Sequence, residues 1–138
     1  MSDLDNPALY VRVASLTFPW ATTWADMRPG HTDRERRENI REIASSDLKP
    51  PSEYIAYWGF RIRVFKAGTS RFDIENVPKV ILDAFCRGQI VRDQSRFASV
   101  GLYDDDTIDH VRILEVIGER VTTSDQTIVE IYGRRVAA

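Results

Sequence analysis

The chain has 138 residues, a mass of 15.9 kDa and a formal net charge of −2, with 43% hydrophobic and 29% charged residues. These values predict one globular domain over residues 1–138 with a buried core. One cysteine and two histidines could not supply a disulfide framework or a structural zinc site. No apolar run approaches the roughly 18 residues of a membrane span, and the acidic first residues lack an export pattern. We therefore expect a cytoplasmic protein with no membrane partner and no organic cofactor.

Hydrophobic periodicity predicts the first elements of the fold. Alternation over residues 9–18 indicates a strand. The polar stretch 33–45 indicates a helix that is largely solvated and carries many ion pairs. Residues 54–66 show the clearest strand pattern, because Phe60, Ile62 and Val64 form an apolar face and Arg61 and Arg63 a basic one.

The second half of the chain adds a helix and two strands. A core-facing helix is predicted from residue 77, with Asn76 as its N-cap, Pro78 in its first turn and Gly88 at its end. Residues 89–103 have no regular pattern. Residues 108–117 and 127–132 indicate strands, and their short connection favours a hairpin. The order β, α, β, α, β, β predicts an α/β or mixed α+β domain, with one mixed sheet flanked by helices.

Acidic residues gather at two places that could meet in the fold. Asp73 and Glu75 are two apart in a segment interpreted as extended, so we expect their carboxylates on one side, and Lys79 follows in the first helical turn. Three aspartates at positions 104–106 precede the third strand. Carboxylates from two segments suit Mg²⁺, and a nearby lysine suits a phosphate. The alternative is that these acids only stabilise a helix start and a turn.

This arrangement resembles the motif of the RusA-like Holliday junction resolvases. The matching residues are Asp73-Ile74-Glu75-Asn76-Val77-Pro78-Lys79, then Asp83-Ala84, then Asp104-Asp105 before a strand. Position 75 carries Glu where the family has Asp, and residues 88–98 lengthen the chain between the two parts of the motif.

The resemblance implies a small homodimeric endonuclease that cuts branched DNA with Mg²⁺, or with Mn²⁺ as a substitute. It implies metal-binding and catalytic roles for Asp73, Glu75 and Asp105, with Asp104 or Asp106 as alternates to Asp105. It also implies an essential catalytic role for Lys79.

Charge is unevenly distributed along the chain. Residues 61–100 carry eight basic and four acidic residues, and residues 101–138 carry four basic and eight acidic ones. A basic middle beside an acidic end suits a polyanion contact next to a cation site. Chance clustering on a mixed surface is the alternative. In the endonuclease interpretation, five arginines contact backbone phosphates: Arg61, Arg63, Arg71, Arg92 and Arg96.

Two other functions stay open from the sequence. A relative that has lost catalysis would bind branched DNA without cutting it, and a small α+β protein-interaction domain would have no nucleic-acid role.

Among the remaining residues, Cys86 is expected to be an inert packed thiol and His110 a structural or surface histidine. Trp20 and Trp24 are expected to pack in the core or a dimer interface, with stacking on an unpaired base as the alternative.

Overall fold

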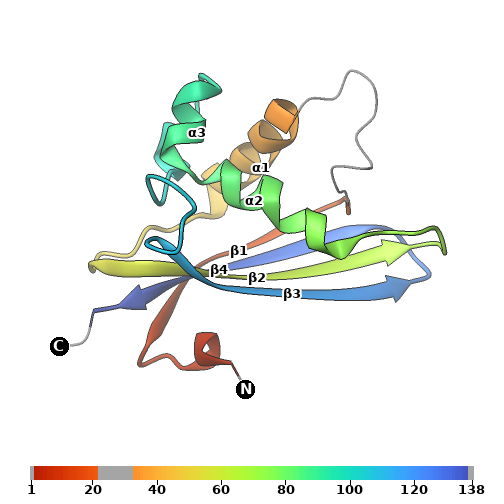
Figure 1. Ribbon diagram of the computed structural model, residues 1–138, viewed down its shortest axis with the longest axis horizontal. Coiled ribbons are helices and arrows are strands. Elements are labelled where there is room, and N and C mark those ends of the chain that lie inside the picture. Colours follow the sequence, from red (N-terminus) through yellow and green to blue (C-terminus); the bar gives the residue numbers. More distant parts are fainter. Residues whose placement is uncertain (1, 22–32, 137–138) are drawn as a thin grey trace.

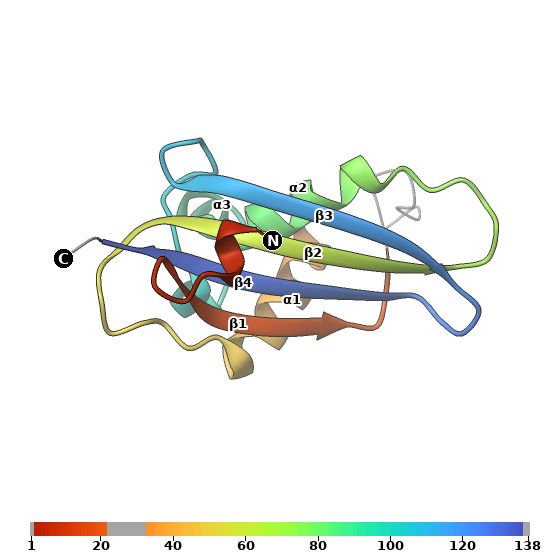
Figure 2. The ribbon, with the colours of Figure 1, turned by 90° about the horizontal axis from the view of Figure 1, so that it is seen from below.

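Four strands form one mixed sheet in the computed structural model, which describes residues 2–21 and 33–136. The strands are β1 (Tyr10–Phe18), β2 (Ile55–Ala67), β3 (Val111–Val121) and β4 (Gln126–Arg135), in the spatial order β1-β4-β2-β3. Strand β4 pairs antiparallel with both β1 and β2, whereas β3 pairs parallel with β2 (Figure 2). The predicted fold class is confirmed.

The predicted hairpin between the last two strands is wrong, because β2 lies between β3 and β4. The connection at residues 122–125 crosses the end of β2 instead of turning back beside β3. Asp125 holds this crossing, because its carboxylate accepts hydrogen bonds from the Ala67 amide at 2.8 Å and from Lys66 Nζ at 3.0 Å. The parallel pairing of β2 with β3 needs a crossover connection, which the helical segment between them provides.

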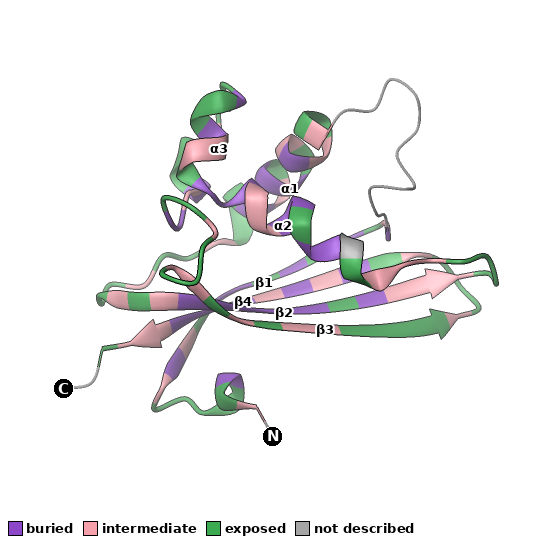
Figure 3. Cartoon of the chain, viewed as in Figure 1, coloured by how far each residue is buried: buried purple, intermediate pink, exposed green. Residues whose placement is uncertain are grey.

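Helices α1 (Asp33–Asp47), α2 (Val77–Ala84) and α3 (Arg87–Arg92) all lie on one face of the sheet (Figure 1). Buried residues gather in the middle of the sheet and on the helices above it (Figure 3). Phe60 of β2 packs in this core against Phe85 and Tyr103, with ring centroids 6.0 and 6.3 Å away. The short 3₁₀ helix η1 (Asp3–Asp5) covers part of the opposite face, where Leu4 is buried.

The single helix predicted from residue 77 to Gly88 is divided in two. It ends at Ala84, and α3 begins at Arg87, so Gly88 lies in the first turn of α3. The break occurs because Cys86 adopts an extended conformation and forms a parallel β-bridge with Tyr103. The segment predicted to be irregular therefore contains α3 and the 3₁₀ helix η4 (Ala98–Val100).

Helix α1 is less solvated than predicted, because Arg37 and Arg41 are buried. Both bind Asp93, which follows α3: Arg37 Nε and Nη2 lie 2.6 and 2.7 Å from its carboxylate oxygens, and Arg41 Nη1 lies 3.0 Å away. Burial alone would raise the pKa of Asp93, but hydrogen bonds from Arg37, Gln89 and Arg41 outweigh it and hold that pKa well below its usual range. We call Arg37, Arg41 and Asp93 the Asp93 cluster; it ties α1 to α3.

Nowhere in residues 2–21 and 33–136 is there a helix with the length and apolar character that crossing a membrane requires.

Candidate functional site

The acidic segment after β2 is docked on the sheet by a short helical turn. Residues Ile74–Asn76 form the 3₁₀ helix η3, which leads directly into α2, so Asn76 lies inside a helical turn instead of at the predicted N-cap. Ile74 packs over Gly118 of β3, where a Cβ atom would lie only 2.5 Å from Ile74 Cδ1. Glycine at position 118 therefore allows η3 to approach the sheet closely.

The extended geometry expected for Asp73 and Glu75 is wrong. Asp73 has extended backbone angles, but Glu75 belongs to η3. In a 3₁₀ helix each residue turns by about 120°, so positions two apart do not share a face as they would in a strand. Glu75 is exposed, and Asp73 is half-buried with its carboxylate 3.2 Å from Arg71 Nε.

Lys79 links the two acidic parts of the motif. Its Nζ lies 3.2 Å from Asp83 Oδ1, one helical turn further along α2, and 3.8 Å from Asp106 Oδ2. We call Lys79, Asp83 and Asp106 the Lys79 cluster. Burial lowers the pKa of Lys79, but the hydrogen bond to Asp83 and the charges of Asp83 and Asp106 outweigh it, so that pKa is raised. The ammonium group therefore stays charged at neutral pH, while its side chain is 55% exposed.

The backbone of the acidic run is fixed against the junction of α2 and α3. The Asp104 carbonyl accepts hydrogen bonds from Cys86 Sγ at 3.2 Å and from the Gly88 amide at 3.3 Å. The buried Tyr103 donates its hydroxyl to the Leu82 carbonyl at 2.6 Å. Cys86 is thus packed inside the domain, as predicted.

The three aspartates have different partners. Asp104 pairs with Arg87 at 3.3 Å. Asp105 is exposed and accepts hydrogen bonds from both the hydroxyl and the amide of Thr107, which lower the pKa of Asp105. Asp106 is the one that faces Lys79. Of the three alternatives left by the sequence, Asp106 lies beside the motif lysine.

The predicted metal ligands Asp73, Glu75 and Asp105 do not surround a common point. Within the part of the chain that the structure describes, no group of three His, Cys, Asp or Glu side chains is arranged to hold a metal ion. The donor set itself is chemically suited to Mg²⁺, since it consists of carboxylate oxygens.

The five arginines predicted to contact DNA are on different surfaces. Arg61 is buried on the face opposite the helices, where it pairs with Asp5 at 3.0 Å and Glu115 at 3.2 Å. Arg63 projects from the same face of β2 and is half-exposed. The other three are exposed: Arg71 before η3, Arg92 in α3 and Arg96 after it.

Three residues near the motif have contacts that the sequence did not predict. Asp83 was identified only as part of the motif, although its spacing of four from Lys79 indicates an ion pair along a helix. Lys66 and Arg120 are adjacent because β2 and β3 pair in parallel register, which the sequence did not reveal.

Trp20 stacks on Phe18 with ring centroids 5.0 Å apart, whereas Trp24 lies outside the described residues.

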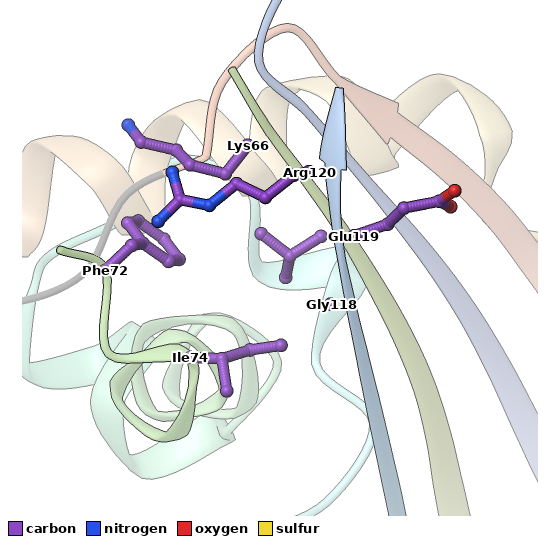
Figure 4. A pocket seen from close by; sticks show the side chains of 7 residues that line it. Lys66, Phe72, Ile74, Gly118, Glu119 and Arg120 are labelled. Carbon is purple, nitrogen blue, oxygen red and sulfur yellow. The ribbon is translucent and has the colours of Figure 1, made fainter. Parts of the chain in front are cut away.

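Lys66 and Arg120 belong to a pocket at the edge of the sheet, which we call the Arg120 pocket (Figure 4). It has a volume of about 260 Å³ and is bounded by the ends of β2 and β3 and the segment before α2. Its lining residues are Val64, Lys66, Phe72, Ile74, Gly118, Glu119 and Arg120. Since Phe72 and Ile74 flank Asp73, the pocket adjoins the acidic segment.

No family model matches this sequence, and the search of curated proteins found no match to it. The resemblance to the RusA-like resolvases therefore depends on the motif residues alone.

Proposed function

We propose that this chain is a Mg²⁺-dependent endonuclease that hydrolyses phosphodiester bonds in branched DNA such as Holliday junctions, with Mn²⁺ as a substitute metal. The observation that carries the proposal is the Lys79 cluster. Lys79 belongs to the first part of the motif and Asp106 directly follows its Asp104-Asp105 pair, yet Lys79 Nζ lies 3.8 Å from Asp106 Oδ2, and it lies 3.2 Å from Asp83 Oδ1. A cytoplasmic homodimer would present two such sites to a symmetric junction.

Lys79 is suited to stabilise negative charge on the phosphate that is cut. Hydrolysis builds charge on the phosphate oxygens, and a fixed cation beside them lowers the barrier. The raised pKa of Lys79 keeps its ammonium charged, and its exposed side chain can reach a ligand. Asp83 and Asp106 orient the ammonium group from two sides.

We propose Asp73, Glu75 and Asp106, which do not form a three-ligand group in this structure, as the acids that would bind the metal together with DNA. Mg²⁺ is commonly held by one or two carboxylates together with substrate phosphates and waters, so DNA would complete the set. When bound, the metal supplies an activated water and polarises the phosphate. Asp106 replaces Asp105 in this assignment, because Asp106 faces Lys79, whereas Asp105 Oδ1 accepts both hydrogen bonds from Thr107.

The exposed arginines on the helix side of the domain are the proposed contacts to backbone phosphates: Arg71, Arg92 and Arg96. Arg61 has a different role in this account. Its buried guanidinium is neutralised by Asp5 and Glu115, so it stabilises the outer face of the sheet.

The test is cleavage of a labelled synthetic four-way junction and a matched linear duplex, with Mg²⁺ or with EDTA. We expect paired nicks on the junction alone, lost with EDTA and in Asp73→Asn. The exposed Asp47 at the end of α1 provides the control Asp47→Asn, which should cut normally. Binding without cutting would instead support a relative that has lost catalysis. Neither binding nor cutting by the folded protein would contradict the proposal and support an interaction domain.

A further inference from the structure

We propose that the Arg120 pocket binds a backbone phosphate of the DNA other than the one that is cut. This inference rests on the proposed function and adds a substrate-positioning site to it. The pocket lies on the helix side of the sheet and shares the segment 72–74 with the acidic motif. DNA that reaches the acidic motif from this side of the sheet can therefore also contact the pocket.

Arg120 provides the principal positive charge. Its Nη1 donates a hydrogen bond to the Gly68 carbonyl at 2.9 Å, and its Nη2 donates one to the Ser70 carbonyl at 2.5 Å. Both partners are neutral, and among the described residues no carboxylate lies within 4.0 Å of its guanidinium. The side chain is thus held in place while its charge stays available, which suits recognition of a phosphate by guanidinium N–H groups.

Lys66 adds a second cation on the neighbouring strand. Lys66 and Arg120 are register partners, and both side chains extend toward the Phe72 ring (Figure 4). Lys66 Nζ lies 5.0 Å from the centre of that ring and 3.0 Å from Asp125 Oδ2. Because Asp125 offsets part of its charge, Lys66 is expected to contribute less to binding than Arg120.

The other walls of the pocket fit the uncharged part of a nucleotide. Val64, Phe72 and Ile74 are apolar, and Glu119 turns its carboxylate away from the pocket (Figure 4). The cavity of about 260 Å³ leaves room for a sugar beside the phosphate. A phosphate contact of this kind positions DNA and carries no base specificity.

The test measures binding of a four-way junction in EDTA, so that cleavage does not enter. Single phosphates of the junction are replaced in turn by neutral methylphosphonates, and each substrate is bound to the wild type and to Arg120→Gln. We expect that one or two of the methylphosphonate replacements weaken binding to the wild type about tenfold. The same replacements should leave binding to Arg120→Gln unchanged. Such non-additivity identifies a direct contact. The slope of log affinity against log salt should also be shallower by about 0.9 in Arg120→Gln than in the wild type, because one phosphate contact is lost.

Arg112→Gln is the matched control. Arg112 lies eight positions earlier on the same strand, about 26 Å away at ~3.3 Å per residue, and is also exposed and bonded to a backbone carbonyl. It should keep the wild-type response to every methylphosphonate. Arg120→Lys retains the charge, so it should keep the salt slope while losing part of the affinity.

The outcomes separate this inference from the function on which it rests. If the wild type binds the junction and Arg120→Gln, folded as judged by circular dichroism, shows the same methylphosphonate profile and salt slope, the pocket is not a phosphate site and the endonuclease proposal stands. If the wild type binds no DNA at all, both are overturned.

Discussion

The Asp93 cluster and the Lys79 cluster are two groups of opposite charges that differ in exposure and in packing. In the Asp93 cluster, the Arg41 side chain is fully buried and that of Asp93 is 5% exposed, with bonds of 2.6 to 3.0 Å. In the Lys79 cluster, Lys79 is 55%, Asp106 33% and Asp83 14% exposed, and the separations are 3.2 and 3.8 Å.

This difference assigns the two clusters different roles. Partners in a buried, fully hydrogen-bonded cluster cannot exchange for a ligand without leaving a charge unpaired in the core, so the Asp93 cluster is structural. The Lys79 cluster contributes less to stability, because its lysine is exposed and water and salt screen that charge. Its lysine can therefore turn to a substrate phosphate at small cost.

The largest effect on stability is expected from Asp93→Ala. Removing this carboxylate leaves Arg37 and Arg41 buried without their partner, which should lower the free energy of unfolding by about 3 to 5 kcal/mol. Urea denaturation measures the change. The control Asp47→Ala alters an exposed residue at the end of α1 and should stay within about 0.5 kcal/mol of the wild type. Equal effects of the two substitutions would mean that the buried cluster is not structural.

The second prediction concerns acid stability. The pKa of Asp93 is lowered in the folded protein from its ordinary value of 3.8, so its contribution to stability is complete above about pH 4 and is lost as the pH falls further. Unfolding measured from pH 5 to pH 2 should show a smaller pH dependence in Asp93→Asn than in the wild type. Parallel curves for the two proteins would contradict this source of acid sensitivity.

A smaller effect is expected where η3 meets the sheet. The Cβ of Gly118→Ala would lie 2.5 Å from Ile74 Cδ1, the end of a flexible side chain, so the substitution should cost about 0.5 to 1.5 kcal/mol of unfolding free energy by forcing Ile74 off its rotamer. Ile74→Val removes Cδ1 and should relieve most of this cost in the double variant, which urea denaturation of all four proteins can measure. Additive effects would show that η3 is not held at this point.

Much of the fold could be predicted because its signals are local. The strands and the α1 and α2 segments follow from periodicity, and the buried Phe60, Ile62 and Val64 were expected from the alternation of β2. The hairpin failed because strand order depends on which strands pair across the sheet, and β2 takes the place beside β3. The buried Arg37 and Arg41 were missed because their partner Asp93 lies far along the chain.

The candidate site was predictable in its parts and not in its arrangement. The motif identified Lys79 and the acidic run, and the structure brings Lys79 next to Asp106. The choice among the three aspartates depends on the turn that Thr107 forms with Asp105, a detail of local hydrogen bonding. Arg120 was missed because its position beside Lys66 follows from parallel pairing of distant strands.

The most direct test of this account compares Asp106→Asn with Asp105→Asn in cleavage of the four-way junction. The two residues are adjacent and the substitutions are chemically identical, but Asp106 faces Lys79 whereas the exposed Asp105 accepts hydrogen bonds from Thr107. We predict that Asp106→Asn abolishes paired nicking while its melting temperature stays close to that of the wild type, and that Asp105→Asn still cuts. Loss of cutting in Asp105→Asn, with normal cutting in Asp106→Asn, would contradict the assignment of the Lys79 cluster as the reactive centre.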